Sequence, residues 1–237
     1  ASATADLNGR ATQIACEAIL KRLKIVAAEE LKTEISSIQI KDEEVFVNGK
    51  VSELTWKKLV MATYIRRISL SEHAHYTPDD IHFDNSIEKG NPFTYHVYGT
   101  GIFTVTIDCI RGTYEFDSVR IVHDFGKSMN AVVDMGQMEG GIVQGMGWMT
   151  MEELLYDKDG KLRSNALSTY KVPDIYSVPK EIMIHALETT KENQAIFKSK
   201  AVGEPPLLYG IGAFFSLRNA IKAFNPESDP PFDAPMT

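Results

Sequence analysis

Cysteine is scarce in this chain, and long apolar runs are missing. The 237 residues include two cysteines, Cys16 and Cys109, with no CxxC spacing anywhere. Two isolated thiols exclude a disulfide framework, a cysteine-rich zinc site and an iron–sulfur cluster held by this chain alone. They also favour a reducing, cytoplasmic setting. No stretch reaches the roughly 18 apolar residues of a membrane-spanning helix and no charged-then-apolar leader opens the chain, so we expect neither a membrane segment nor a signal peptide.

Basic residues are also in the minority. Lysine and arginine number 25 against 32 aspartates and glutamates, which gives a formal net charge of −7. This balance argues against nucleic acid or an anionic membrane as a partner. The hydrophobic content of 43% is ordinary for a globular protein, and this length suits one large or two small domains. Because the chain begins at Ala1 rather than Met, we expect it to be a piece of a longer product.

Periodicity predicts helices interspersed with strands. Apolar residues recur every three or four positions in four segments, which predicts helices over 8–31, 56–67, 127–155 and 207–224. Alternation of apolar and polar residues predicts short strands within 38–51, 68–70, 93–97, 103–109, 119–123, 182–186 and 195–197. Asn48-Gly49 and Asp159-Gly160 are predicted tight turns, and 78–92 is a predicted loop. Since strands and helices do not alternate strictly, the fold class is α+β, with mixed sheets and several packed helices.

The same elements suggest how the chain is divided. We expect one domain over residues 1–225, with a possible subdivision near residue 125 into 1–125 and 126–225. Four prolines lie within 226–237, so we expect this segment to be an extended tail. No internal repeat is present.

Segment 134–150 combines many glycines with polar side chains. Each glycine inside a helix costs about 0.5–1 kcal/mol relative to alanine, so their accumulation needs a reason. One reason is close packing of the helix on a crowded core. The other is a flat polar ligand that lies against the open backbone, with the amides of Gln137 and Gln144 at its edge. The residues leave both interpretations open, and they exclude a dinucleotide fingerprint because no GxGxxG follows a strand here. The five glycines are Gly136, Gly140, Gly141, Gly145 and Gly147.

Glu204 lies in the sequence Gly203-Glu204-Pro205-Pro206, just before the last predicted helix. Pro205 is expected to hold Glu204 outside the helical region and to fix the orientation of its carboxylate. Desolvation would raise the pKa of this carboxyl group and the helix N-terminus would lower it, which leaves a base suited to neutral pH. The alternative is an acid that only complements the helix dipole.

Three other motifs are weaker. His73-x-His75 could place two metal ligands on one face of a strand, but no third ligand is near in the sequence, and an exposed pair is the simpler interpretation. His123-Asp124 could be a hydrogen-bonded structural pair. Lys198 and Lys200 could steer an anionic substrate, although solvated side chains are the simpler interpretation.

Several motifs, in a fixed order, resemble the xanthine dehydrogenase/aldehyde oxidase family. They include GQMEGGIVQGMG at 136–147, STYKVP at 168–173 and KAVGEPPL at 200–207. The resemblance covers nearly the whole chain and is weakest over 32–55, which looks like an insertion. It implies that the chain is the C-terminal part of the molybdopterin-binding region, closer to the xanthine dehydrogenases than to other members.

The resemblance also implies roles for individual residues. Gln137 would hydrogen-bond the pterin cofactor, and Ala1, Ser2 and Thr4 would lie along it. Glu204 matches the catalytic glutamate, whose implied role is to accept a proton as a water-derived oxygen attacks an electron-poor carbon of the substrate. In this family molybdenum is held by the pterin dithiolene, so no side chain of this chain is needed as a metal ligand.

The implied function is that of a cytoplasmic oxidoreductase of purine catabolism that hydroxylates hypoxanthine or xanthine. The alternatives are the same chemistry on aldehydes or other N-heterocycles, a non-catalytic module that keeps only the packing, and a metal-dependent hydrolase that uses His73 and His75. The other half of the molybdopterin region, the 2Fe-2S and FAD modules and the substrate-clamping residues would lie upstream or on partner chains, so we expect the chain alone to be inactive. A homo-oligomer of the full assembly is a further implication of the family.

Overall fold

A computed structural model describes residues 4–187 and 195–237, and their contacts divide the chain into two compact units. The N-terminal unit comprises residues 4–79, and the C-terminal unit begins at residue 80. The division therefore lies near residue 79 and not near residue 125, because the strand that ends at His123 pairs on both sides with strands of the same unit. Among the described residues, no helix has both the length and the apolarity needed to cross a lipid bilayer.

The N-terminal unit combines two helices with a small antiparallel sheet of order β1-β2-β3. The turn between β2 and β3 is made by Asn48 and Gly49, whose φ angles of 48° and 78° are typical of the tight turn that the sequence predicts. Thr55 caps α2 by accepting a hydrogen bond from the backbone N–H of Lys58 at 3.4 Å. Both predicted helices and the predicted meander are confirmed, although the first helix begins at Thr4 rather than residue 8. The elements are α1 (Thr4–Glu30), η1 (Ile35–Ser37), β1 (Ile38–Lys41), β2 (Glu44–Val47), β3 (Lys50–Val51) and α2 (Trp56–Ile65).

The C-terminal unit is built on a mixed sheet of order β6-β7-β8, in which β6 and β7 are antiparallel and β7 and β8 are parallel. A separate hairpin, β4-β5, lies within the predicted loop 78–92. The elements are β4 (His82–Asp84), β5 (Lys89–Asn91), β6 (Gly99–Asp108), β7 (Thr113–His123), α3 (Ala131–Thr150), β8 (Glu181–Ala186), η2 (Ile196–Lys198), η3 (Pro205–Gly210) and α4 (Ile211–Phe224).

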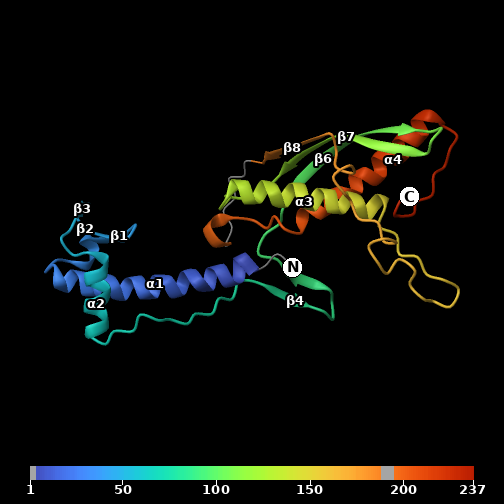
Figure 1. Cartoon of the computed structure of the whole chain (residues 1–237). Coiled ribbons are helices and arrows are strands. Elements are labelled where there is room, and N and C mark those ends of the chain that lie inside the picture. The colour runs from blue at the N-terminus through green and yellow to red at the C-terminus, as the bar shows by residue number, and fades with distance from the viewer. Residues whose placement is uncertain (1–3, 188–194) are drawn as a thin grey trace. The chain divides into compact units, whose positions relative to one another are not determined.

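Helices α3 and α4 pack on one face of the β6-β7-β8 sheet (Figure 1). Phe116 and Val119 of β7 both point into this core although they are three residues apart, because the register with β6 shifts between Thr104 and Val105. The α+β class with mixed sheets and packed helices is thus confirmed. The buried side chains of this core are Phe116, Val119, Ile121, Phe125, Met138, Ile142, Met146, Ala213 and Leu217.

Some local predictions were wrong. Segments 68–70 and 93–97 contain no strand, and 195–197 lies at the 3-10 turn η2 instead. In 93–97 the alternation reflects tertiary contacts of a loop, since the Tyr95 hydroxyl accepts a hydrogen bond from the backbone N–H of Ala201 at 3.0 Å. Helix α3 covers less than the predicted 127–155, and its start is set by the Asn130 side chain, which caps the helix.

The tail 226–237 has neither helix nor strand, but it is packed against α3 and α4. The Phe232 ring meets the Phe214 ring edge to face with centroids 5.3 Å apart, and Arg218 donates hydrogen bonds to backbone carbonyls of the tail. Near the end of the chain, the backbone N–H of Met236 donates to the carbonyl of Met149 at 2.8 Å. These contacts anchor the tail to the C-terminal unit.

Candidate active site

The glycines of α3 lie on two different faces of the helix. Gly141 and Gly145 face η3 at backbone contact distance. A Cβ atom on Gly145 would lie 2.1 Å from the carbonyl oxygen of Leu207, and one on Gly141 would lie 2.8 Å from Cβ of Pro206. Close packing therefore explains these two glycines, because no larger residue fits between α3 and η3.

The second face of α3 is open. Cβ atoms added to Gly136 and Gly140 would meet no atom within 4 Å. With 3.6 residues per turn, Gln137 and Gln144 lie on the same side of the helix, and both are exposed. Each of these two glycines costs the helix about 0.5–1 kcal/mol without a packing gain among the described residues. The surface formed by these four residues, the open face of α3, thus fits a flat polar group that lies against the backbone.

Glu204 precedes η3, which packs on the glycine face of α3 next to this open face. It is the N-cap residue of η3, and Pro206, two positions later, packs on Gly141 of α3. Gly141 follows Gln137 by four residues, or about one helical turn of 5.4 Å. The side chain of Glu204 is exposed and makes no capping hydrogen bond to η3. The structure therefore brings together the two segments that the sequence singles out.

One expectation about Glu204 was wrong. Its backbone angles, φ −92° and ψ −39°, are helical, although Pro205 follows it. A proline disfavours this conformation in the preceding residue but does not forbid it, and the packing of Pro206 on Gly141 holds the turn in place. The residue as a whole is exposed in this chain.

A buried ion pair lies at the base of the segment that leads to Glu204. The Nζ atom of Lys200 is 2.5 Å from Oδ2 of Asp124 and donates a further hydrogen bond to the carbonyl of His96 at 2.9 Å. The other carboxylate oxygen of Asp124 accepts the backbone N–H of Gly126 at 2.9 Å. The side chains of Lys200 and Asp124 are 6% and 0% exposed, so the expectation that Lys200 is solvated was wrong.

His123, next to this pair, is buried and bonds a different residue. Its Nδ1 atom lies 2.8 Å from the hydroxyl of Tyr209 at the end of η3. Burial lowers the pKa of His123 more than the nearby Asp124 carboxylate raises it, so the imidazole is neutral at pH 7. Burial and the same carboxylate raise the pKa of Tyr209. This contact ties η3 to the end of β7.

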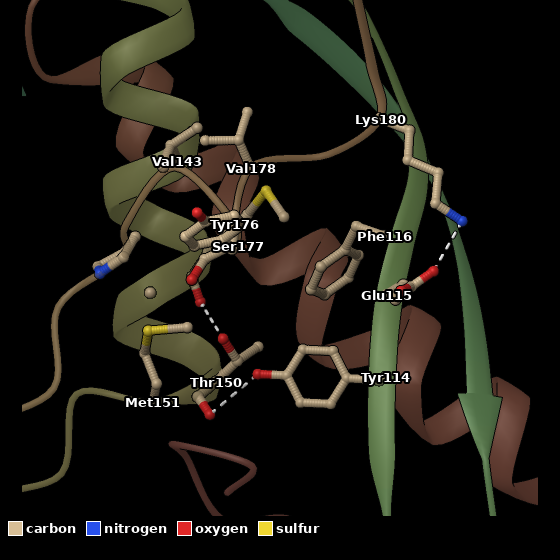
Figure 2. A pocket seen from close by; sticks show the side chains of 13 residues that line it. Tyr114, Glu115, Phe116, Val143, Thr150, Met151, Tyr176, Ser177, Val178 and Lys180 are labelled. Atoms are coloured by element: carbon tan, nitrogen blue, oxygen red, sulfur yellow. Dashed lines mark hydrogen bonds and ion pairs between the residues drawn. The ribbon is translucent and has the colours of Figure 1, made fainter.

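A cavity of about 260 Å³ lies between α3, β7 and the segment that precedes β8. Figure 2 shows Tyr114 and Phe116 pointing into it from β7. Its polar lining is largely engaged, since the Tyr114 hydroxyl donates to the Thr150 carbonyl at 3.4 Å and the Lys180 ammonium lies 2.8 Å from the Glu115 carboxylate. Glu204, Gln137 and Gln144 do not line this cavity. We therefore take the open face of α3, and not the cavity, as the candidate active site.

The remaining predicted site residues lie elsewhere. Thr4 is exposed at the start of α1 in the N-terminal unit, and Ala1 and Ser2 lie outside the described residues, so the contacts of these three with a pterin stay predictions. His73-x-His75 is exposed in the N-terminal unit. Across residues 4–187 and 195–237, no group of three His, Cys, Asp or Glu side chains could hold a metal ion, so this pair finds no third ligand.

Comparison with known proteins shows the family of this chain. Residues 1–179 match the molybdopterin cofactor-binding domain. The xanthine dehydrogenase/oxidase of Mus musculus is 39% identical over 94% of this chain, and the xanthine dehydrogenase of Oryza sativa subsp. japonica is 34% identical over the whole chain. The chain spans only 15% and 17% of the lengths of these two relatives.

Two solved structures share the fold. The quinoline 2-oxidoreductase of Pseudomonas putida 86 matches 94% of this chain and 28% of its own with a TM-score of 0.72 and 25% identity. The aldehyde oxidoreductase of Desulfovibrio desulfuricans matches 66% of this chain and 17% of its own with a TM-score of 0.58 and 24% identity. The match to the latter concerns the fold alone.

The open face of α3 fits the cofactor of this family. A pterin is flat and rich in hydrogen-bonding atoms, and Gly136 and Gly140 leave bare backbone beside the exposed amide of Gln137. The chain belongs to the molybdopterin cofactor-binding domain family and is homologous to the C-terminal part of the xanthine dehydrogenases, which belong to the molybdenum hydroxylase family.

Proposed function

We propose that this chain is the C-terminal catalytic segment of a molybdenum hydroxylase that oxidises a purine such as hypoxanthine or xanthine, with Glu204 as the general base. One observation carries the proposal: Pro206 packs on Gly141, which brings the turn that starts with the exposed Glu204 against α3, next to its open face. The 39% identity to a xanthine dehydrogenase/oxidase supports a purine as the substrate.

In this proposal each residue has a separate task. Gly136 and Gly140 let a flat cofactor approach the backbone of α3, and the amide of Gln137 hydrogen-bonds its edge. Thr4 at the start of α1 would add a hydroxyl contact, with Ala1 and Ser2 along the same cofactor. When bound, the molybdenum cofactor supplies an activated oxygen from water and takes up the electron pair of the substrate.

Glu204 is the proton acceptor in this proposal. Its carboxylate accepts the proton that is released as the water-derived oxygen joins the electron-poor carbon of the ring. A general base must be held within hydrogen-bond reach of that proton, and Glu204 is fixed by the Pro205-Pro206 turn at the start of η3. A positioned base of this kind contributes about 10²–10⁴-fold to the rate.

Other parts of the enzyme complete the site. Gln137 and Glu204 are both exposed in this chain, which spans about 15% of the length of its relatives. We propose that the remainder supplies the other half of the molybdopterin region, the 2Fe-2S and FAD modules and the substrate-clamping residues, in a homo-oligomeric assembly. The free thiols of Cys16 and Cys109 support a cytoplasmic location.

The test compares steady-state xanthine oxidation by the complete enzyme that contains this chain with that of two variants. Glu204→Gln removes the base, and Glu227→Gln is a matched control at an exposed acid of the tail. We expect Glu204→Gln to lose about 10²–10⁴-fold in kcat at unchanged molybdenum content, and Glu227→Gln to keep the wild-type value. Wild-type turnover by Glu204→Gln refutes the proposal.

A second candidate is the same chemistry on another N-heterocycle or on an aldehyde, and the TM-score of 0.72 to a quinoline 2-oxidoreductase favours the heterocycle. Measuring kcat/KM of the complete enzyme for xanthine, quinoline and benzaldehyde separates these substrates. Purine oxidation predicts the highest value for xanthine. A cofactor-loaded protein that oxidises none of them would be a non-catalytic module.

A further inference from the structure

We propose that the buried ion pair of Asp124 and Lys200 positions Glu204: it holds the segment 199–204 in one conformation and so fixes the carboxylate beside the open face of α3. This inference rests on the proposed function, in which Glu204 is the general base. Asp124 and Lys200 are positioning residues, because they act on Glu204 through the backbone.

The geometry of the pair leaves it little freedom. The ammonium of Lys200 contacts Oδ2 of Asp124 at 2.5 Å and the carbonyl of His96 at 2.9 Å, and it lies 5.6 Å from the centroid of the Tyr98 ring. The second carboxylate oxygen of Asp124 is bound by the N–H of Gly126. Two charges removed from water this fully are tolerated only when such contacts are all satisfied, so the pair favours one arrangement.

Backbone contacts couple the pair to Glu204. The N–H of Lys200 donates to the carbonyl of Phe125 at 2.9 Å, directly beside Asp124 in the sequence. The next N–H, that of Ala201, donates to the hydroxyl of Tyr95 at 3.0 Å. Glu204 follows Ala201 by three residues, so we expect a shift of the lysine to reach it through a short stretch of backbone.

The segment follows a turn with an unfavourable backbone conformation. Phe197 and Lys198 have φ angles of 50° and 63°, in the left-handed region that side chains other than glycine rarely adopt. Such residues persist only where their surroundings impose the conformation, and they gather at functional sites. Here Ser199, which follows them, forms an isolated antiparallel bridge with Gly126. Lys200 of the ion pair directly follows Ser199, so in our proposal the pair holds this bridge in place.

Two other roles for the pair have to be distinguished from positioning. Lys200 is 6% exposed, so it is poorly placed to attract an anionic substrate from solvent. A purely stabilising role would make the geometry of the pair unimportant for kcat. The experiment therefore has to separate stability from positioning.

The variants are Lys200→Met, Asp124→Asn, the double variant and Lys127→Met, all in the complete, cofactor-loaded enzyme. Each single variant leaves one buried charge uncompensated and should lower the melting temperature. The double variant removes both charges and should recover most of the stability, but not the hydrogen bonds of the ammonium. Lys127→Met is the matched control, because Lys127 is an exposed lysine of the neighbouring segment.

Positioning predicts that the double variant keeps a near-wild-type melting temperature but loses about 10²-fold in kcat with KM little changed. In cofactor-free protein, amide hydrogen exchange over 199–204 should become faster in the double variant and stay unchanged in Lys127→Met. Wild-type kcat and exchange in a stable double variant overturn the inference. If the double variant does not fold, Asp124→Glu tests the positioning role instead, because it keeps both charges and moves the carboxylate. A loss of about tenfold or more in kcat supports positioning, and a wild-type kcat overturns it.

The experiments distinguish a failure of the proposed function from a failure of the positioning role. If Glu204→Gln keeps wild-type turnover, the proposed function fails, and the exchange measurement still reports whether the pair orders the segment. If Glu204→Gln is inactive but the double variant has wild-type kcat and exchange, only the positioning role fails.

Discussion

Alanine at Gly145 and alanine at Gly140 should change the stability of the protein in opposite directions. A Cβ atom at Gly145 would lie 2.1 Å from the carbonyl oxygen of Leu207 and 3.1 Å from Cα of Gly210, and both neighbours are backbone atoms that cannot rotate away. Overpacking of this kind costs about 1–3 kcal/mol, against about 0.5–1 kcal/mol gained when alanine replaces a helical glycine. We therefore expect Gly145→Ala to lower the free energy of unfolding by about 1–2 kcal/mol.

At Gly140 the added methyl group meets nothing within 4 Å, so only the helix propensity changes. Gly140→Ala should raise the free energy of unfolding by about 0.5–1 kcal/mol and, because the methyl group stands on the open face, should lower the molybdenum content of the complete enzyme. Urea unfolding of cofactor-free protein, followed by circular dichroism, measures the first effect, and metal analysis measures the second. Equal stability of the two variants would refute the packing of α3 on η3, and unchanged molybdenum content would refute the role of the open face.

Three more outcomes follow from individual contacts. Burial holds the pKa of His123 below its unfolded value near 6.5, so unfolding below that pH takes up a proton. The melting temperature should therefore fall as the pH drops below about 6.5. His123→Gln should flatten this pH dependence, whereas the control His185→Gln, at an exposed histidine, should not. Asn130→Ala removes the 3.3 Å capping hydrogen bond at the start of α3 and should cost about 1 kcal/mol in urea unfolding, and no loss would show that this cap is dispensable. Gln137→Ala should lower the molybdenum content of the complete enzyme without changing the unfolding free energy, because the side chain is exposed, and full molybdenum occupancy would contradict its role as a pterin ligand.

The elements that could be predicted from the sequence are those whose pattern is local. The 3.6-residue periodicity of α1 and the alternation along β6 and β7 are visible within each segment, and the structure has all three. In contrast, the alternating residues of 93–97 lie in a loop, because the Tyr95 hydroxyl bonds the backbone of a segment more than a hundred positions away. A local pattern cannot show such a contact.

Some residues of the candidate site could likewise be predicted from local sequence patterns, and others could not. Gln137 and Glu204 stand out because glycines accumulate around one and two prolines follow the other, which are local anomalies. The pair of Asp124 and Lys200 could not be predicted, because these residues are 76 positions apart and only the fold brings them together. Whether a given glycine packs on a neighbour or lies open likewise depended on where η3 sits against α3.

The rate at which xanthine reduces the molybdenum centre in a single anaerobic turnover tests the role of Glu204 most directly, since it isolates the chemical step from later electron transfer. We expect this rate to fall about 10²–10⁴-fold in Glu204→Gln at unchanged molybdenum content and substrate affinity, and to stay at the wild-type value in Glu227→Gln. Reduction of Glu204→Gln at the wild-type rate would contradict the assignment of this carboxylate as the base.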